Sequence, residues 1–139
     1  MFALPENATI EEVWSLFKND RYPVTTLDPQ ILEAGHGHAV VRMKIGENHI
    51  NGFGTVMGGV LFTLADFAFG IAANIGQPPT LTASGVIDFM AKAKGDELTV
   101  SCDLDKDGRT LCFATAHVRD GEGREVARLS FVGCRTARD

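Results

Sequence analysis

A single acidic residue interrupts the longest apolar segment of the chain. The segment covers residues 58–73, and Asp66 is its only charged residue. A helix that is apolar on every face is normally buried, and an unpaired carboxylate in such surroundings is costly. The carboxylate therefore either performs chemistry or lies at the one point of the helix that water reaches. The segment alone leaves both interpretations open.

Two glycines, Gly58 and Gly59, begin this segment. The first turn of a helix leaves backbone N–H groups unpaired and positively polarised, and glycine lets a ligand oxygen approach them. A developing oxyanion could bind there; a tight turn or close helix packing is the alternative. Gly59 and Asp66 share a helix face but are separated by roughly 10 Å along the axis. Two antiparallel helices in a symmetric homodimer could bring them to one carbonyl, whereas one helix could not.

Length and composition predict one globular domain, residues 1–139, in the cytoplasm. The 139 residues are 45% hydrophobic and 22% charged, an ordinary balance. The net charge of −5 and the absence of a basic run argue against a nucleic-acid partner. We expect no secretion signal and no membrane span. The cysteines favour a reducing compartment. Neither the cysteines nor the histidines have the spacing of metal ligands, so we expect no metal site.

Hydrophobic periodicity predicts an α+β fold. Residues 9–18 are expected to form a helix capped by Thr9 within an N-terminal helical extension, residues 1–22, and Pro23 is expected to prevent its continuation. A loop of turn-forming residues, 46–54, precedes the long helix, which is expected at about residues 58–74. Several antiparallel strands with one buried helix predict a sheet wrapped around that helix. Alternation and turn signals place the strands at residues 25–34, 38–45, 80–92, 98–104, 110–119 and 125–135.

The loop and the start of the long helix resemble a known enzyme family. Residues 49–66 read H-I-N-G-F-G-T-V-M-G-G-V-L-F-T-L-A-D. This segment resembles the signature of hotdog-fold acyl-CoA thioesterases of the phenylacetate-pathway (PaaI) type, approximately H-x-N-x-x-G-x-x-H-G-G-x-x-x-x-L-x-D. The resemblance implies a hotdog fold, homodimers with shared active sites and often homotetramers. It also implies hydrolysis of acyl-CoA, with no cofactor beyond the coenzyme A of the substrate.

The resemblance further implies roles for individual residues. Asp66 matches the carboxylate that acts as general base or as nucleophile. The backbone N–H of Gly58 or Gly59 matches the group that polarises the thioester carbonyl. Asn51 matches the residue that orients water or the leaving group, and Thr82 lies where many relatives carry a hydroxyl near the carboxylate.

The other candidates would contact the substrate. Ser84 competes with Thr82 because the register after the double proline is open, and His49 matches the motif, with a loop-holding role as the alternative. Met57 stands where the family usually has His, and a thioether donates no hydrogen bond; acyl-CoA binding without turnover is therefore a second hypothesis. Phosphates of coenzyme A could contact basic side chains at a turn edge, namely Lys92, Lys94 and Arg109. Five aromatic rings could line a tunnel for the acyl group, although most of them are expected in the core. They are Phe53, Phe62, Phe67, Phe69 and Phe89.

Overall fold

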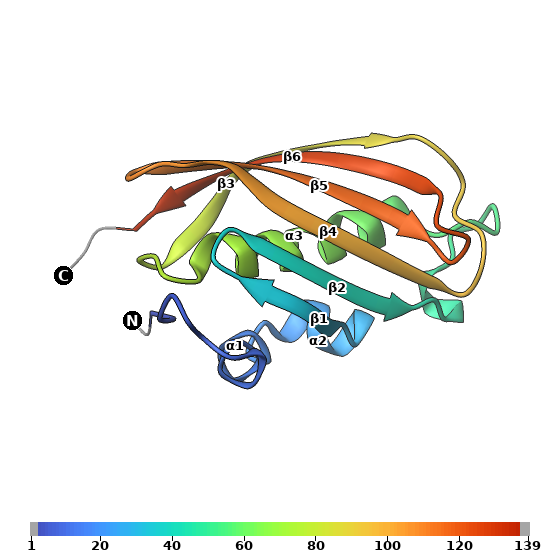
Figure 1. Cartoon of the computed structure of the whole chain (residues 1–139). Coiled ribbons are helices and arrows are strands. Elements are labelled where there is room, and N and C mark those ends of the chain that lie inside the picture. Colours follow the sequence, from blue (N-terminus) through green and yellow to red (C-terminus); the bar gives the residue numbers. More distant parts are fainter. Residues whose placement is uncertain (1–2, 137–139) are drawn as a thin grey trace.

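In the computed structural model, which describes residues 3–136, an antiparallel sheet curves around one long helix (Figure 1). Helix α3, Gly58–Asn74, lies against the concave face of the sheet. The six strands follow the order β1-β2-β4-β5-β6-β3. Their bounds are β1 Gln30–Gly35, β2 His38–Lys44, β3 Thr80–Phe89, β4 Glu97–Asp107, β5 Leu111–Asp120 and β6 Glu125–Arg135. The predicted α+β architecture is confirmed.

The sheet surrounds α3 because alternate strand residues are buried against it. In β5, for example, every second residue from Cys112 to Val118 is buried, while the intervening side chains face outward. Phe69 of α3 stacks on Phe131 of β6 with ring centroids 4.8 Å apart. A Cβ atom at Gly133 would lie 2.9 Å from the Phe69 ring, so glycine makes room for this aromatic contact. The helix is therefore fixed against the sheet by close packing along its length.

The N-terminal helical region is longer than predicted. Helix α1, Ile10–Phe17, has the predicted Thr9 cap, but a second helix, α2, spans Arg21–Leu27. Pro23 lies in the first turn of α2, where its missing N–H needs no partner; the expectation that it prevents further helix was wrong. The residues after it are helical rather than extended because the Thr25 hydroxyl donates to the Arg21 carbonyl, at 2.6 Å.

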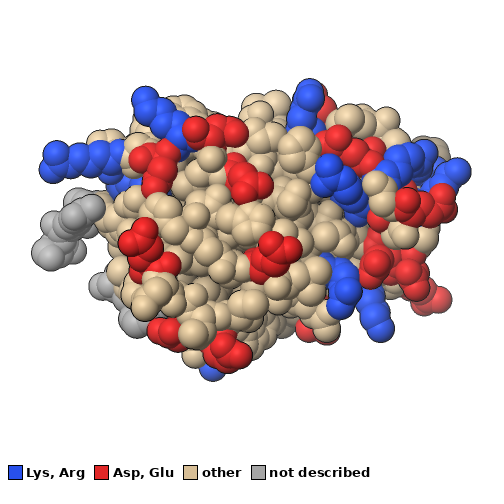
Figure 2. Space-filling view, viewed as in Figure 1, with Lys and Arg blue, Asp and Glu red and all other residues tan. Residues whose placement is uncertain are grey.

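Strand β3 is shorter than predicted and forms one edge of the sheet. It ends at Phe89, because the amides of Met90 and Ala91 both donate to the Val126 carbonyl and the chain leaves the ladder. Within residues 3–136, no helix is long and apolar enough to cross a membrane. Figure 2 shows acidic and basic side chains interspersed on the displayed face, with no continuous basic area there.

Candidate active site

The loop before α3 is held together by Asn51 and His49. The Asn51 side-chain oxygen accepts hydrogen bonds from the amides of Phe53, at 2.9 Å, and Thr55, at 3.1 Å. The His49 ring is buried; Nδ1 accepts from the Gly46 amide and Nε2 donates to the Thr26 carbonyl, at 2.8 and 2.6 Å. Both ring nitrogens are thus occupied, which fits the loop-holding alternative for His49.

The loop leads into the first turn of α3, where two backbone N–H groups have no hydrogen-bond acceptor among residues 3–136. The Val60 amide donates to the Met57 carbonyl, at 2.9 Å, whereas the amides of Gly58 and Gly59 have no hydrogen-bond partner in the described part of the chain. Met57 occupies the N-cap position without a side-chain capping bond, and its side chain is exposed. Two polarised donors therefore remain available at the positive end of α3.

The carboxylate of Asp66 is half-buried on α3 and is oriented by a hydroxyl from β3. Thr82 Oγ1 donates to Asp66 Oδ1 at 2.7 Å. Ser84 does not compete for this contact. The pairing of β3 with β6 shifts register between Thr82 and Ser84, so Thr82 lies opposite the buried Gly133 and Ser84 opposite Val132. Thr82 consequently faces α3, whereas Ser84 faces the outer side of the sheet.

A second carboxylate, absent from the sequence-based candidates, lies near Asp66. Phe17, three residues before Asp20, packs edge-on against Phe67 of α3, so the end of α1 lies against the helix that carries Asp66. Partial burial, and then the negative charge of Asp66, raise the pKa of Asp20 above its ordinary value. No motif marks Asp20, because its proximity to Asp66 depends on the packing of the N-terminal segment.

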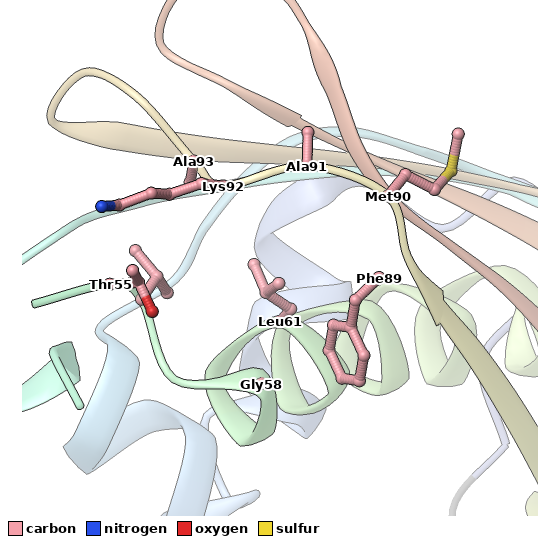
Figure 3. Close-up of a pocket in the computed structure, with 9 residues that line it drawn as sticks. Thr55, Gly58, Leu61, Phe89, Met90, Ala91, Lys92 and Ala93 are labelled. Carbon is pink, nitrogen blue, oxygen red and sulfur yellow. The ribbon is translucent and has the colours of Figure 1, made fainter. Parts of the chain in front are cut away.

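A pocket of about 470 Å³ opens beside the start of α3 (Figure 3). Its lining is mainly apolar and is drawn from the loop, the first turn of α3 and the segment after β3. The lining residues are Thr55, Val56, Gly58, Leu61 and residues 89–93. Asp66 and Thr82 do not line it, which agrees with the roughly 10 Å that separates the two ends of this helix segment. Within one protomer, the pocket beside Gly58 therefore does not include the carboxylate.

The three basic candidates do not converge. Lys92 lines the pocket, and the backbone of the exposed Lys94 is bound to the β5–β6 turn through the Asp120 carboxylate. Arg109 lies at the opposite end of α3: the neighbouring Gly108 carbonyl accepts from Arg135, which also donates to Ala73 in the last turn of the helix. One phosphate group cannot contact both Lys92 and Arg109 of the same protomer.

Of the five phenylalanines named as candidates for an acyl tunnel, one lines the pocket. Phe89 borders it, Phe67 and Phe69 are buried in the core, and Phe53 is 91% exposed on the loop. Phe62 packs edge-on against Phe131. Periodicity alone could not single out Phe89, because the exposure of its ring depends on where β3 leaves the sheet.

Comparison with known proteins identifies the family. Residues 53–127 match the sequence model of the Thioesterase superfamily. The chain is 31% identical over 114 residues to the acyl-coenzyme A thioesterase PaaI of Escherichia coli (strain K12), an alignment that covers 81% of each protein.

Two solved structures share the fold. The structure of the E. coli PaaI protein from the phenylacetic acid degradation operon matches with a TM-score of 0.84 at 24% identity, over 94% of this chain and 97% of that one. A hypothetical thioesterase of Streptococcus pneumoniae TIGR4, solved with coenzyme A, matches with a TM-score of 0.82 at 27% identity, over 90% and 98%. The predicted resemblance is confirmed: the chain belongs to the thioesterase superfamily, a family of thioester hydrolases, and has the hotdog fold of its PaaI-type members.

Proposed function

We propose that this protein hydrolyses an acyl-CoA thioester to coenzyme A and a free carboxylic acid. The observation that carries the proposal is the Asp66 carboxylate, half-buried on an apolar helix and oriented by Thr82 at 2.7 Å. The unpaired amides of Gly58 and Gly59 supply the complementary electrophilic group. The acyl-CoA thioesterase named among the relatives and the coenzyme A in the pneumococcal structure support this substrate class.

The proposed chemistry divides between these two groups. The Gly58 and Gly59 amides hydrogen-bond the thioester carbonyl oxygen as it becomes an oxyanion. Asp66 either takes a proton from the attacking water or attacks the carbonyl carbon itself, forming an anhydride that water then hydrolyses. In both routes the C–S bond breaks and the coenzyme A thiolate acquires a proton. A single turnover in ¹⁸O-labelled water distinguishes direct attack by water, which places one ¹⁸O atom in the released acid, from attack by Asp66 followed by hydrolysis at the Asp66 carbonyl, which places the ¹⁸O atom in Asp66 and none in the acid. The reaction needs no cofactor beyond the coenzyme A of the substrate.

We further propose that the active form is a homodimer with shared sites. Strand β3 is an edge strand with exposed apolar residues, Leu81 at 64% and Val86 at 63%, and an edge of this kind favours pairing with another chain. Pairing of two antiparallel copies would bring the Gly59 amide of one protomer to Asp66 of the partner subunit. Assembly of two dimers into a tetramer, testable by light scattering, and a cytoplasmic location stay predictions.

The first test is Asp66→Asn, which keeps the size of the side chain and an acceptor for Thr82 but removes the base. We expect a loss of kcat of about 10²–10⁴-fold, the usual contribution of a general base, with an unchanged melting temperature. Asp88→Asn is the matched control, because it removes the same charge from an exposed residue of β3. Normal turnover of acyl-CoA by the Asp66→Asn protein would refute the assigned role.

A mixing experiment tests the shared site. Asp66→Asn and Gly59→Val proteins, each inactive alone, are unfolded together and refolded. Random pairing makes half of the dimers mixed, and each mixed dimer has one intact site, so about a quarter of wild-type turnover should return. If both halves of a site came from one protomer, no activity would return.

Met57 favours a second candidate function, acyl-CoA binding without hydrolysis. Its exposed thioether stands at the N-cap of α3, where it supplies no hydrogen-bond donor. Calorimetric binding of an acyl-CoA that is not turned over would support this candidate. A Met57→His protein with a higher rate would show that the missing imidazole limits hydrolysis.

A further inference from the structure

The ring of Phe89 forms one end of the pocket and lies directly on the first residue of α3 (Figure 3). A Cβ atom at Gly58 would lie 2.8 Å from Cζ and 3.0 Å from Cε1 of this ring. The ring therefore contacts the helix backbone with no side chain between them. It is nevertheless 59% exposed, so the rest of the ring borders open space. Phe89 consequently adjoins the amides proposed to bind the thioester.

The opposite end of the pocket is polar. Lys92 extends away from Phe89, on the side where Thr55 lies (Figure 3). The Lys92 ammonium forms no ion pair with any residue between 3 and 136. In an acyl-CoA, the thioester separates the phosphates from the acyl group. The cation at one end and the aromatic ring at the other therefore orient the substrate, with its phosphates toward Lys92 and its acyl group toward Phe89.

Apolar surface continues behind the ring. Phe89, Ile87 and Gly85 pair with the buried residues of β6, so all three face α3. Ile87 is half-buried, and the Phe62 ring occupies the space beside Gly85, where a Cβ atom would lie 2.9 Å from its Cζ. A longer acyl chain would have this surface available only if the Phe89 ring were absent.

We propose that Phe89 sets the upper length of the acyl group, so that the enzyme acts on short-chain acyl-CoAs and excludes long ones. The inference rests on the proposed hydrolase function and adds a specificity-determining residue to it. In an apolar pocket, one methylene changes kcat/KM by roughly 10–200-fold, so a wall placed at the thioester produces a steep dependence on chain length.

The test measures kcat/KM for acetyl-, butyryl-, hexanoyl-, octanoyl- and decanoyl-CoA. The wild-type protein should show values that fall sharply with chain length. In Phe89→Ala, the ratio of decanoyl-CoA to butyryl-CoA turnover should rise at least about tenfold. In Phe89→Trp, a larger ring should lower hexanoyl-CoA turnover relative to acetyl-CoA turnover. Phe113→Ala is the matched control, since it removes the same kind of ring from an exposed position of β5 that faces the outer side of the sheet.

The possible outcomes distinguish failure of the hydrolase function from failure of the role assigned to Phe89. A wild-type protein that turns over no acyl-CoA would refute the hydrolase function. Turnover with the same chain-length profile in wild type, Phe89→Ala and Phe89→Trp would overturn the role of Phe89 alone. A lower melting temperature of Phe89→Ala with an unchanged profile would likewise make the ring a packing element only.

Discussion

The two glycines at the start of α3 should respond differently to the same substitution. A Cβ atom at Gly59 would meet nothing within 4 Å, whereas one at Gly58 would lie 2.8 Å from the ring of Phe89. Overpacking of this kind costs about 1–3 kcal/mol. At Gly58 we expect the smallest cost in this range, because the Phe89 ring is more than half exposed and can rotate outward. Gly58→Ala should therefore destabilise the protein by about 1 kcal/mol relative to Gly59→Ala, a melting difference of a few degrees.

Urea denaturation of the two variants measures this difference, and a double-mutant cycle identifies its cause. If the Phe89 ring is the obstacle, Gly58→Ala should cost little in a Phe89→Ala background, and the two substitutions should be non-additive. Outward rotation of the ring should also give Gly58→Ala the longer-chain selectivity expected of Phe89→Ala. Equal stability of the Gly58→Ala and Gly59→Ala proteins, or strict additivity in the cycle, would refute this account of the helix start.

Two further predictions concern titratable groups. Amide donors, foremost that of Lys94, lower the pKa of Asp120, so its stabilising effect is present above the unfolded pKa of about 4 and is lost as the pH falls. The difference between the urea midpoints of wild type and Asp120→Asn should therefore be constant near pH 7 and shrink progressively below about pH 4; a difference that does not shrink in acid would contradict this. Burial raises the pKa of the Cys102 thiol to about 12, whereas Cys134 is exposed. Iodoacetamide should alkylate Cys134 and spare Cys102 in the folded protein, as mass spectrometry can check, and equal labelling would count against the buried thiol.

Local patterns predict the parts of the fold that depend on neighbours in sequence. The predicted limits of α3 agree with the structure, because an apolar run between a glycine pair and a double proline has few alternatives. Strands β4, β5 and β6 alternate clearly and pair in the order of the sequence, whereas β3 pairs with β6. The strand predicted from residue 25 is wrong over its first half because threonine favours strands on average, while here its hydroxyls bond back to helix carbonyls.

Candidate site residues could be named from the sequence, whereas their spatial arrangement, and the position of Asp20, could not. The choice between Thr82 and Ser84 depends on one register shift in β3, and a single extra residue in a strand leaves no mark in the sequence. The distance between Lys92 and Arg109 follows from the length of α3 and the sheet order. The proximity of Asp20 to Asp66 depends on contacts between segments that are remote in the chain. Each of these features is a property of tertiary packing.

The strand order has a consequence for synthesis of the protein on the ribosome. Among residues 3–136, β3 pairs only with β6, which is the last strand of the sheet to be made. Until β6 emerges, the nascent chain exposes both edges of a segment that carries Leu81, Val86 and Phe89, and such edges invite aggregation. Completion of the sheet must therefore follow emergence of β6, and a chain truncated before this strand would leave β3 without its place in the sheet.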